Sequence, residues 1–309
     1  MTASTPPFRR TDNASLGILM MLVSVFLFSI LNVLVKTLSD TYPVTEISFF
    51  RNAFALVPVV VAVAVQGGAA TLRTARPLGH VWRSAIGLCA MMLMFWSFAL
   101  LPLADAIALN FTTPLILTAL SVPLLGEKVG VHRWSAVAVG FVGVLVIVRP
   151  TGAVLELGAA VAIAAAFCQS LAMVAIRQLS RSEPPNTIVF YFTVLTTLMS
   201  ACTLPFAWVT PTPGDFMLLA LTGLVGGMAQ LFLTRAYSLA QAATVAPFNY
   251  TSLLWAVLFG WLLWGELPEV SAVIGAGIVA LSGLYILQRE TRRRSDVVTG
   301  GRSTMTGND

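Results

Sequence analysis

The chain has 309 residues, of which 57% are hydrophobic and only 10% are charged, and its mean hydropathy is +0.87. A soluble domain carries about 25% charged residues, so this composition excludes a water-soluble globular protein and indicates an integral membrane protein. The net charge of +5 is attributed to membrane topology and anionic lipid head groups, and nucleic-acid binding is not expected, because no basic face remains outside the membrane.

Ten apolar segments lie between two polar tails, which are expected at residues 1–15 and 289–309. A span needs about 20 mostly apolar residues, and only helices or closed barrels satisfy their backbone polar groups in lipid. The segments are longer than barrel strands and do not alternate apolar with polar residues, so we expect an all-α integral membrane protein with ten transmembrane helices. The expected spans are Leu16–Val35, Val44–Val65, Val81–Leu100, Ala104–Leu125, Val131–Val148, Leu157–Ile176, Thr187–Ala207, Phe216–Ala236, Ala243–Leu263 and Val270–Leu287.

The basic residues predict the orientation of the chain. The first segment is too long for a signal-peptide core and lacks a small-residue cleavage site, so we expect it to be a span that starts in the cytoplasm. Of the 18 basic residues, Lys36 and Arg149 then lie outside and Arg51 lies within the second span, while all the others lie inside. This bias predicts that both termini are cytoplasmic and that both tails, including the run Arg292–Arg294, are disordered.

One stretch of the chain occurs twice. Phe98–Glu127 aligns without a gap on Tyr237–Glu266, 139 positions later. The block Asn110-Phe111-Thr112-Thr113 falls on Asn249-Tyr250-Thr251-Ser252, and Gly126-Glu127 falls on Gly265-Glu266. At the start of each half, Lys36 falls on Arg177 and Pro43 on Pro184 at an offset of 141. We therefore expect two repeats, at residues 16–150 and 151–288.

Each repeat holds five spans, and five is an odd number, so the second repeat should cross the membrane in the opposite sense to the first. Inverted repeats of this kind are typical of secondary transporters, which bind substrate near the middle of the membrane where the repeats meet.

The chain resembles the drug/metabolite transporter superfamily, and specifically its ten-span EamA-type members, over roughly Ser15–Gln288. The resemblance rests on the five-plus-five duplication, on Pro102–Ala106 before the fourth span, on the two Gly-Glu pairs and on Arg51. It implies a central cavity built from spans one, three, four, six, eight and nine and exposed alternately to each side. Members of the superfamily move amino acids, nucleotide sugars, vitamins, S-adenosylmethionine and organic cations.

Polar groups are costly inside a membrane, and tryptophans within spans can stack on a planar or cationic ligand, so both kinds are candidates for binding. Asn110 and Asn249 hold matching positions, and their amides either bind substrate or tie one helix to another. The candidate substrate-binding residues are Asn32, Trp96, Asn110, Thr113, Gln169, Gln230, Asn249, Tyr250 and Trp255.

Four charged residues are candidates for gating or structural roles, namely Arg51, Asp105, Glu127 and Glu266. Arg51 lies about 10 Å into its span, and three roles are open: it binds substrate, it snorkels to the outer interface, or it pairs with Glu46 or Asp105. Glu127 and Glu266 lie at helix ends on opposite faces, where each either orients the following helix or belongs to a gating pair.

Several types of chemistry are not indicated by the sequence. No carboxylate falls in the middle of a span, and His80 and His132 are expected in cytoplasmic loops, so transport is expected to be facilitated or exchange-type unless a proton couples at Asp105. We expect no metal, no cofactor and no enzymatic activity, because no nucleophile–base pair or ligand set lies at depth. The three cysteines have no metal-ligand spacing and are interpreted as apolar fillers: Cys89, Cys168 and Cys202.

The expected function is a secondary transporter of the cell inner membrane that moves a small organic metabolite by alternating access. Neutral or zwitterionic substrates fit the residues best, and export of amino-acid-like or drug-like compounds is the main hypothesis. The alternative is an importer of riboflavin or S-adenosylmethionine. Glycines in spans five and ten predict close packing within one bundle, with a homodimer interface as the alternative.

Overall fold

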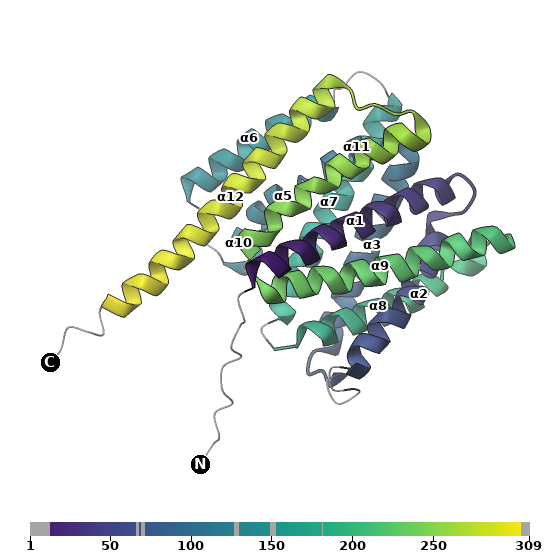
Figure 1. Ribbon diagram of the computed structural model, residues 1–309, viewed down its shortest axis with the longest axis horizontal. Coiled ribbons are helices and arrows are strands. Elements are labelled where there is room, and N and C mark those ends of the chain that lie inside the picture. The colour runs from purple at the N-terminus through teal and green to yellow at the C-terminus, as the bar shows by residue number, and fades with distance from the viewer. Residues whose placement is uncertain are drawn as a thin grey trace, which may run out of the picture.

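The computed structural model describes residues 13–65, 68, 72–126, 130–148, 153–180, 182–240 and 242–303, and the regular elements of this part are all helical (Figure 1). The α-helices are α1 Ala14–Ser39, α2 Val44–Val65, α3 Pro77–Leu100, α4 Leu103–Asn110, α5 Thr113–Leu125, α6 Val131–Val148, α7 Ala153–Leu179, α8 Pro185–Ala201, α9 Pro213–Leu239, α10 Ala242–Val245, α11 Thr251–Trp264 and α12 Val270–Ser303. Two short 3-10 segments are η2 Leu204–Phe206 and η3 Ala246–Tyr250. Glu127 lies outside the described residues.

Seven of the described helical stretches are long and apolar enough to cross a membrane: α1, α2, α3, α4 with α5, most of α7, α8 with η2, and most of α9. Shorter apolar stretches lie in α6 and α12, and α11 is a further apolar helix. Large apolar side chains such as Leu145 and Leu254 are exposed on the surface, as expected of helices that face lipid. The chain is therefore a multi-pass membrane protein.

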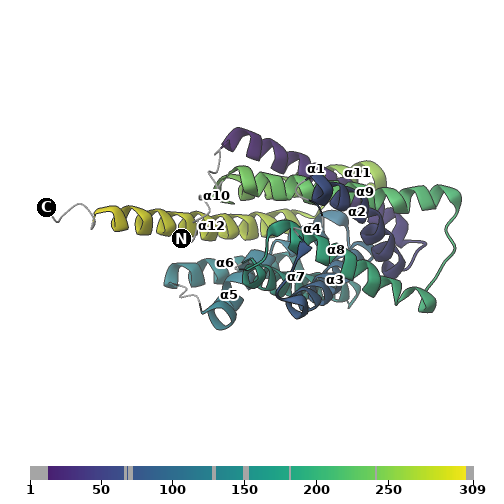
Figure 2. The same ribbon diagram turned by 90° about the horizontal axis from the view of Figure 1, so that it is seen from below.

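The helices form two layers, and each helix in one layer has its counterpart from the other half of the chain in the second layer. Figure 2 shows α1, α9 and α11 in one layer and α3, α5 and α7 in the other. Helix α1 packs against α9 and, correspondingly, α7 packs against α3. The pair α2–α9 likewise corresponds to α8–α3, and α6 packs directly on α12. Each of these pairs joins one half to the other, so much of the packing between helices is also packing between the halves.

Glycines bring α6 and α12 into close contact within the chain. A Cβ atom on Gly143 would lie 2.9 Å from the carbonyl oxygen of Gly275, and one on Gly275 would lie 2.6 Å from that of Gly143. Small residues permit such close backbone approach in membranes, so these two glycines serve packing within one bundle.

The repeated Gly-Glu pair follows from how two helices end. Helices α5 and α11 each stop at a glycine in the left-handed conformation, Gly126 with φ 67° and Gly265 with φ 66°. Glycine is the residue that adopts this conformation without strain. The cap therefore explains the glycine of each repeated Gly-Glu pair and fixes where the chain leaves the helix.

The tail expected to be disordered is helical over much of its length, because α12 continues to Ser303 and projects from the bundle (Figure 1). Residues 288–294 contain no proline or glycine to end the helix, and arginine, glutamate and glutamine all favour helix. The apolar pattern ends near Leu287, but backbone propensity favours continuation of the helix through Arg294.

Candidate functional site

Spans four and nine are both interrupted at the repeated Asn-aromatic-Thr block. Helix α4 ends at Asn110 and α5 begins at Thr113, while the 3-10 segment η3 passes into α11 between Tyr250 and Thr251. Pro114 and Pro247 lie beside these breaks and donate no backbone hydrogen bond. The backbone at both breaks keeps right-handed helical angles, and Phe111 and Thr112 donate to the carbonyls three residues earlier, so each break is a local tightening of the helix and not unwound backbone. A stretch of 3-10 helix in the middle of a longer helix often marks a functional hinge.

The repeated hydroxyl groups satisfy backbone carbonyls at the breaks. Thr112 donates to the Leu109 carbonyl at 2.5 Å and Thr113 donates to the Asn110 carbonyl at 2.7 Å. In the second half, Thr251 donates to Phe248 at 2.6 Å and Ser252 to Asn249 at 2.8 Å. The matched hydroxyls therefore make the same kind of hydrogen bond in both halves. The hydroxyl of Thr113, a candidate for substrate binding, is used in this bond to the backbone.

The two breaks meet each other inside the bundle. The rings of Phe111 and Tyr250 lie with centroids 4.7 Å apart, and α4 packs against α11. Ser170 of α7 donates to the Thr113 carbonyl at 2.9 Å, which attaches a third helix to the first break. The Asn249 side chain lies close to the hydroxyl of Tyr237 on α9. Residues from four expected spans therefore converge on the matched asparagines.

Three other polar candidates carry unused amide groups. Asn32 on α1, Gln169 on α7 and Gln230 on α9 are half-buried, and none of their side chains makes a hydrogen bond within the described chain. Amides in this state can donate to and accept from a ligand.

The rings of the two tryptophan candidates, Trp96 and Trp255, do not stack on the Phe111–Tyr250 pair. Trp255 packs against Phe26 at 4.8 Å and Phe259 at 5.8 Å between centroids, at the contact of α11 with α1. Trp96 on α3 is 44% exposed and has no ring contact among the described residues. Their proposed role as stacking groups thus requires a ligand that extends away from the Phe111–Tyr250 pair.

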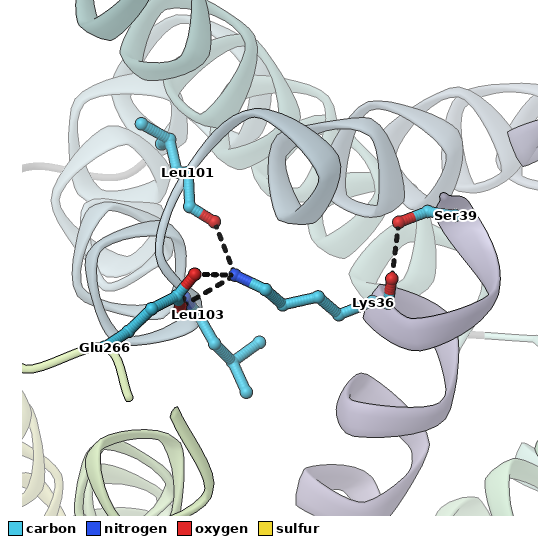
Figure 3. Close-up of polar contacts among 5 residues, drawn as sticks. All are labelled: Lys36, Ser39, Leu101, Leu103 and Glu266. Atoms are coloured by element: carbon cyan, nitrogen blue, oxygen red, sulfur yellow. Dashed lines mark hydrogen bonds and ion pairs between the residues drawn. The ribbon is translucent and has the colours of Figure 1, made fainter. Parts of the chain in front are cut away.

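An ion pair joins the last turn of α1 to the end of α11 (Figure 3). The ammonium of Lys36 donates to both carboxylate oxygens of Glu266, at 2.9 and 2.8 Å, and to the Leu101 carbonyl at 3.1 Å. The backbone amide of Leu103 donates to Glu266 at 3.4 Å, and the ammonium lies 5.1 Å from the centroid of the Trp264 ring. The side chains of Lys36 and Glu266 are 10% and 30% exposed.

This cluster ties together α1, the α3–α4 connection and α11 at one end of the bundle. The carboxylate of Glu266 contacts Lys36, so Glu266 does more than orient the following helix. The sequence did not assign Lys36 to the site, although its match with Arg177, and the match of Glu266 with Glu127, showed a repeated basic–acidic pattern. Asp105 lies one turn into α4, within electrostatic reach of this pair, and one of its oxygens is buried without a hydrogen bond.

Arg51 does not pair with either carboxylate that was considered for it. Its Nη1 donates to Asn52 Oδ1 at 2.9 Å, whereas Glu46 accepts from the backbone amide of Val209 at 2.9 Å. Arg51 is only 9% exposed, so it does not snorkel into the interface either. Both structural alternatives are therefore wrong, and substrate binding is the alternative that stays open.

The two histidines lie in helices rather than in loops. Helix α3 begins at Pro77, before the apolar run, so His80 is buried in its first turn and stacks on Tyr191 with centroids 4.7 Å apart. His132 is exposed at the start of α6. His80 Nε2 lies 3.9 Å from Glu183, in the α7–α8 connection.

Glu183 fastens two connections at this end of the bundle. Its carboxylate accepts from the Thr74 hydroxyl at 2.9 Å and from the Ala75 amide at 3.0 Å. Burial acts to raise the pKa of Glu183, but the hydrogen bonds and the nearby His80 outweigh it, so the pKa is lowered.

Comparison with known proteins assigns the fold and the class. The profile of the EamA-like transporter family matches residues 15–149 and again residues 156–288. The chain is 31% identical to a riboflavin transporter of Rhizobium johnstonii, covering 91% of this chain and 94% of the relative. It is 33% identical to a pseudopaline exporter of Pseudomonas aeruginosa, covering 86% and 94%, and 28% identical to an S-adenosylmethionine uptake transporter of Rickettsia prowazekii, covering 90% and 95%. A solved crystal structure shares the fold, with a TM-score of 0.63 at 20% identity over 91% of this chain and all of that one.

Proposed function

Because the chain belongs to the EamA-like transporter family, we propose that it is a secondary carrier that moves a small organic metabolite across the cell inner membrane by alternating access. The family and the relatives are membrane transporters, so the chain is a transporter and not an enzyme. The observation that carries the mechanism is the meeting of two broken helices at Phe111 and Tyr250, with Lys36 and Glu266 paired at one end of the same bundle.

The carrier is built, in this proposal, from ten spans in two inverted repeats at residues 16–150 and 151–288. The exchange of packing partners between halves supports a two-fold relation, since α1–α9 corresponds to α7–α3. The odd number of spans per repeat and the placement of basic residues support both termini in the cytoplasm. A central site then faces one side at a time as the two layers rock against each other.

Separation of Lys36 from Glu266 is the proposed step that opens the bundle at their end. Both members of the pair are largely withdrawn from solvent, and Lys36 also holds the Leu101 carbonyl. Pairing stabilises the closed arrangement, because an unpaired charge withdrawn from water is costly. Glu127, the match of Glu266 in the first repeat, is proposed to act at the other face.

The substrate class follows from the side chains around the breaks. Neutral amides of Asn32, Asn110, Gln169, Gln230 and Asn249 can bind polar groups in several orientations. Tyr250, Trp96 and Trp255 can contact planar or apolar parts. We infer an amino-acid-like or drug-like substrate and export as the main direction, in line with the relative named as a pseudopaline exporter.

The second candidate function is import of a vitamin or nucleoside-type metabolite. The relatives named as a riboflavin transporter and as an S-adenosylmethionine uptake transporter favour it. Both candidate functions use the same site and differ in the direction of net flux.

Counterflow in proteoliposomes tests the function directly. Thermal-shift screening of the purified full chain against a metabolite panel identifies ligands, because a bound ligand stabilises the folded state by mass action. Vesicles preloaded with a ligand should then accumulate its labelled form transiently, and protein-free vesicles should not. Absence of counterflow for every ligand that stabilises the protein would contradict the carrier, while net flux in oriented vesicles distinguishes export from import.

A further inference from the structure

Two arginines have no anionic partner in the described chain: Arg51 on α2, which is buried, and Arg83 on α3, which is half-buried. Each lies on a helix face with two further polar residues at the same spacing: Ser48, Arg51 and Asn52 on α2, and His80, Arg83 and Ser84 on α3. Residues three and four positions apart share a helix face. The two faces belong to adjacent helices, and the charge of Arg51 is within electrostatic reach of Arg83.

Most of the polar atoms on these faces are buried and unused. Nε of Arg51, Nδ2 of Asn52, Nε and Nη1 of Arg83, and the hydroxyls of Ser48 and Ser84 have no hydrogen-bond partner. Arg83 as a whole is half-buried, but these two nitrogens are out of contact with solvent. Buried polar groups are nearly always satisfied, and an exception calls for an unseen ligand, ion or water.

The helices make room for each guanidinium with a glycine. A Cβ atom on Gly226 of α9 would lie 3.3 Å from Arg51 Nε, and one on Gly87 of α3 would lie 2.7 Å from Arg83 Nη1. Gly87 and Gly226 are 139 positions apart, the offset of the central repeat. Both halves therefore have a glycine at the matching position, and each glycine leaves room for the guanidinium of one arginine.

The fold does not need an arginine at position 51. At the offset of 141 that relates the starts of the two halves, Arg51 falls on Phe192 of α8. Phe192 packs against Gly87 as Arg51 packs against Gly226, and the guanidinium carbon of Arg83 lies 3.6 Å from the Phe192 ring centroid. An apolar ring fills the equivalent place in the other half, so packing alone does not explain a buried cation here.

We propose that Arg51 and Arg83 bind an oxyanion, a carboxylate or phosphate group, of the transported substrate between α2, α3, α8 and α9. This inference rests on the proposed carrier function and narrows its substrates to compounds that carry such a group. A guanidinium presents paired N–H donors that match two oxygens of an oxyanion, and it stays charged when buried. Ser48, Asn52 and Ser84 supply neutral donors beside the two cations.

Thermal unfolding of the full chain in nanodiscs tests the proposal with sodium citrate and inorganic phosphate as probes. Each is compared with sodium chloride at equal ionic strength, at millimolar concentrations where general salt effects on stability are small. The wild-type midpoint should rise with citrate, with phosphate or with both, and which of them acts identifies carboxylate or phosphate as the preferred group. No rise with either oxyanion would overturn the proposal.

Arg51→Met and Arg83→Met should each abolish this rise, while Arg76→Met, which removes an exposed arginine just before α3, should leave it intact. Without probe, Arg51→Met and Arg83→Met should unfold at the same temperature as the wild type or higher, because each removes a charge that has no partner and is withdrawn from solvent. A lower midpoint without probe, or a rise retained in both of these variants, would instead show a structural role and contradict oxyanion binding. If a neutral ligand shows counterflow while neither citrate nor phosphate raises the unfolding midpoint, this inference alone would be overturned. The carrier function would then still stand.

Discussion

The aromatic rings of Phe111 and Tyr250, which hold matching positions 139 residues apart, contact each other with centroids 4.7 Å apart. In the proposed two-fold arrangement, a residue meets its own repeat counterpart only if the axis that would relate the two repeats passes near the contact. The breaks in spans four and nine therefore lie near the centre of the molecule, where the matched asparagines flank the contact.

Replacing either matched asparagine should impair transport. Asn110→Ala and Asn249→Ala each remove one hydrogen-bonding amide, and loss of one or two such bonds to substrate corresponds to about a tenfold lower transport efficiency. Counterflow at several substrate concentrations measures the effect, with membrane insertion checked by extraction and yield. Asn186→Ala, at the start of α8, is the matched control and should transport normally. Normal transport by both central variants would remove the asparagines from the site.

Breaking the Lys36–Glu266 pair should destabilise the protein and alter transport. Lys36→Met or Glu266→Gln leaves a partly buried charged or polar group without its partner, which should cost about 1 to 2 kcal/mol after allowance for solvent screening. Thermal unfolding measures the loss of stability, and the rate of substrate flux measures the effect of weaker closure at this end of the bundle.

The charge-reversed double variant Lys36→Glu with Glu266→Lys should recover part of both quantities. Recovery is partial because a glutamate at position 36 faces the Leu101 carbonyl, which accepts a hydrogen bond from the native lysine. A double variant as impaired as the sum of Lys36→Glu alone and Glu266→Lys alone would show that the two residues do not act as a pair.

Mild oxidation should link α3 to α7 through a native cysteine pair. The sulfur atoms of Cys89 and Cys168 lie 3.9 Å apart, while Cys202 lies at the end of α8 and is exposed. Small movements bring the first two to bonding distance, so copper-phenanthroline should yield a Cys89–Cys168 disulfide by peptide mapping. Cys168→Ser should abolish it and Cys202→Ser should not. Crosslinking of Cys202 in preference to Cys89 would contradict the packing of α3 on α7.

The stability of the protein should fall in acid through Glu183. Its folded-state pKa is lowered below the ordinary value of 4.5, so its contribution is fully present above that value and is lost as the pH falls through the folded pKa. The difference in unfolding temperature between wild type and Glu183→Gln should be constant near neutral pH and shrink in acid below 4.5. If the difference in unfolding temperature grew as the pH fell, the pKa of Glu183 would be raised on folding and not lowered.

The sequence predicted helices and the repeat well because both depend on local patterns. Apolar length located the seven described stretches that are long and apolar enough to cross a membrane, and matched residues located the asparagines that the structure places at the two breaks. The breaks themselves were not predicted, because a membrane helix often tolerates a short polar block and a nearby proline, such as Asn110–Thr113 followed by Pro114.

Long-range partners were the least predictable features. Lys36 and Glu266 are 230 positions apart, so neither residue identified the other. His80 was expected in a loop because it precedes the apolar run, whereas Pro77 starts α3 early and places His80 within the helix. Hydropathy reports where a span is apolar and says little about the polar first turns of the same helix.

Side-specific labelling of a cysteine placed at Asn249, in a chain whose three native cysteines are replaced by alanine, tests alternating access most directly. With Lys36 and Glu266 intact, a membrane-impermeant thiol reagent should react mainly from the side opposite to this pair. Addition of Lys36→Met should increase labelling from the side of the pair and decrease it from the other. Equal labelling from both sides at once, or labelling unchanged by Lys36→Met, would contradict a central site that opens to one side at a time.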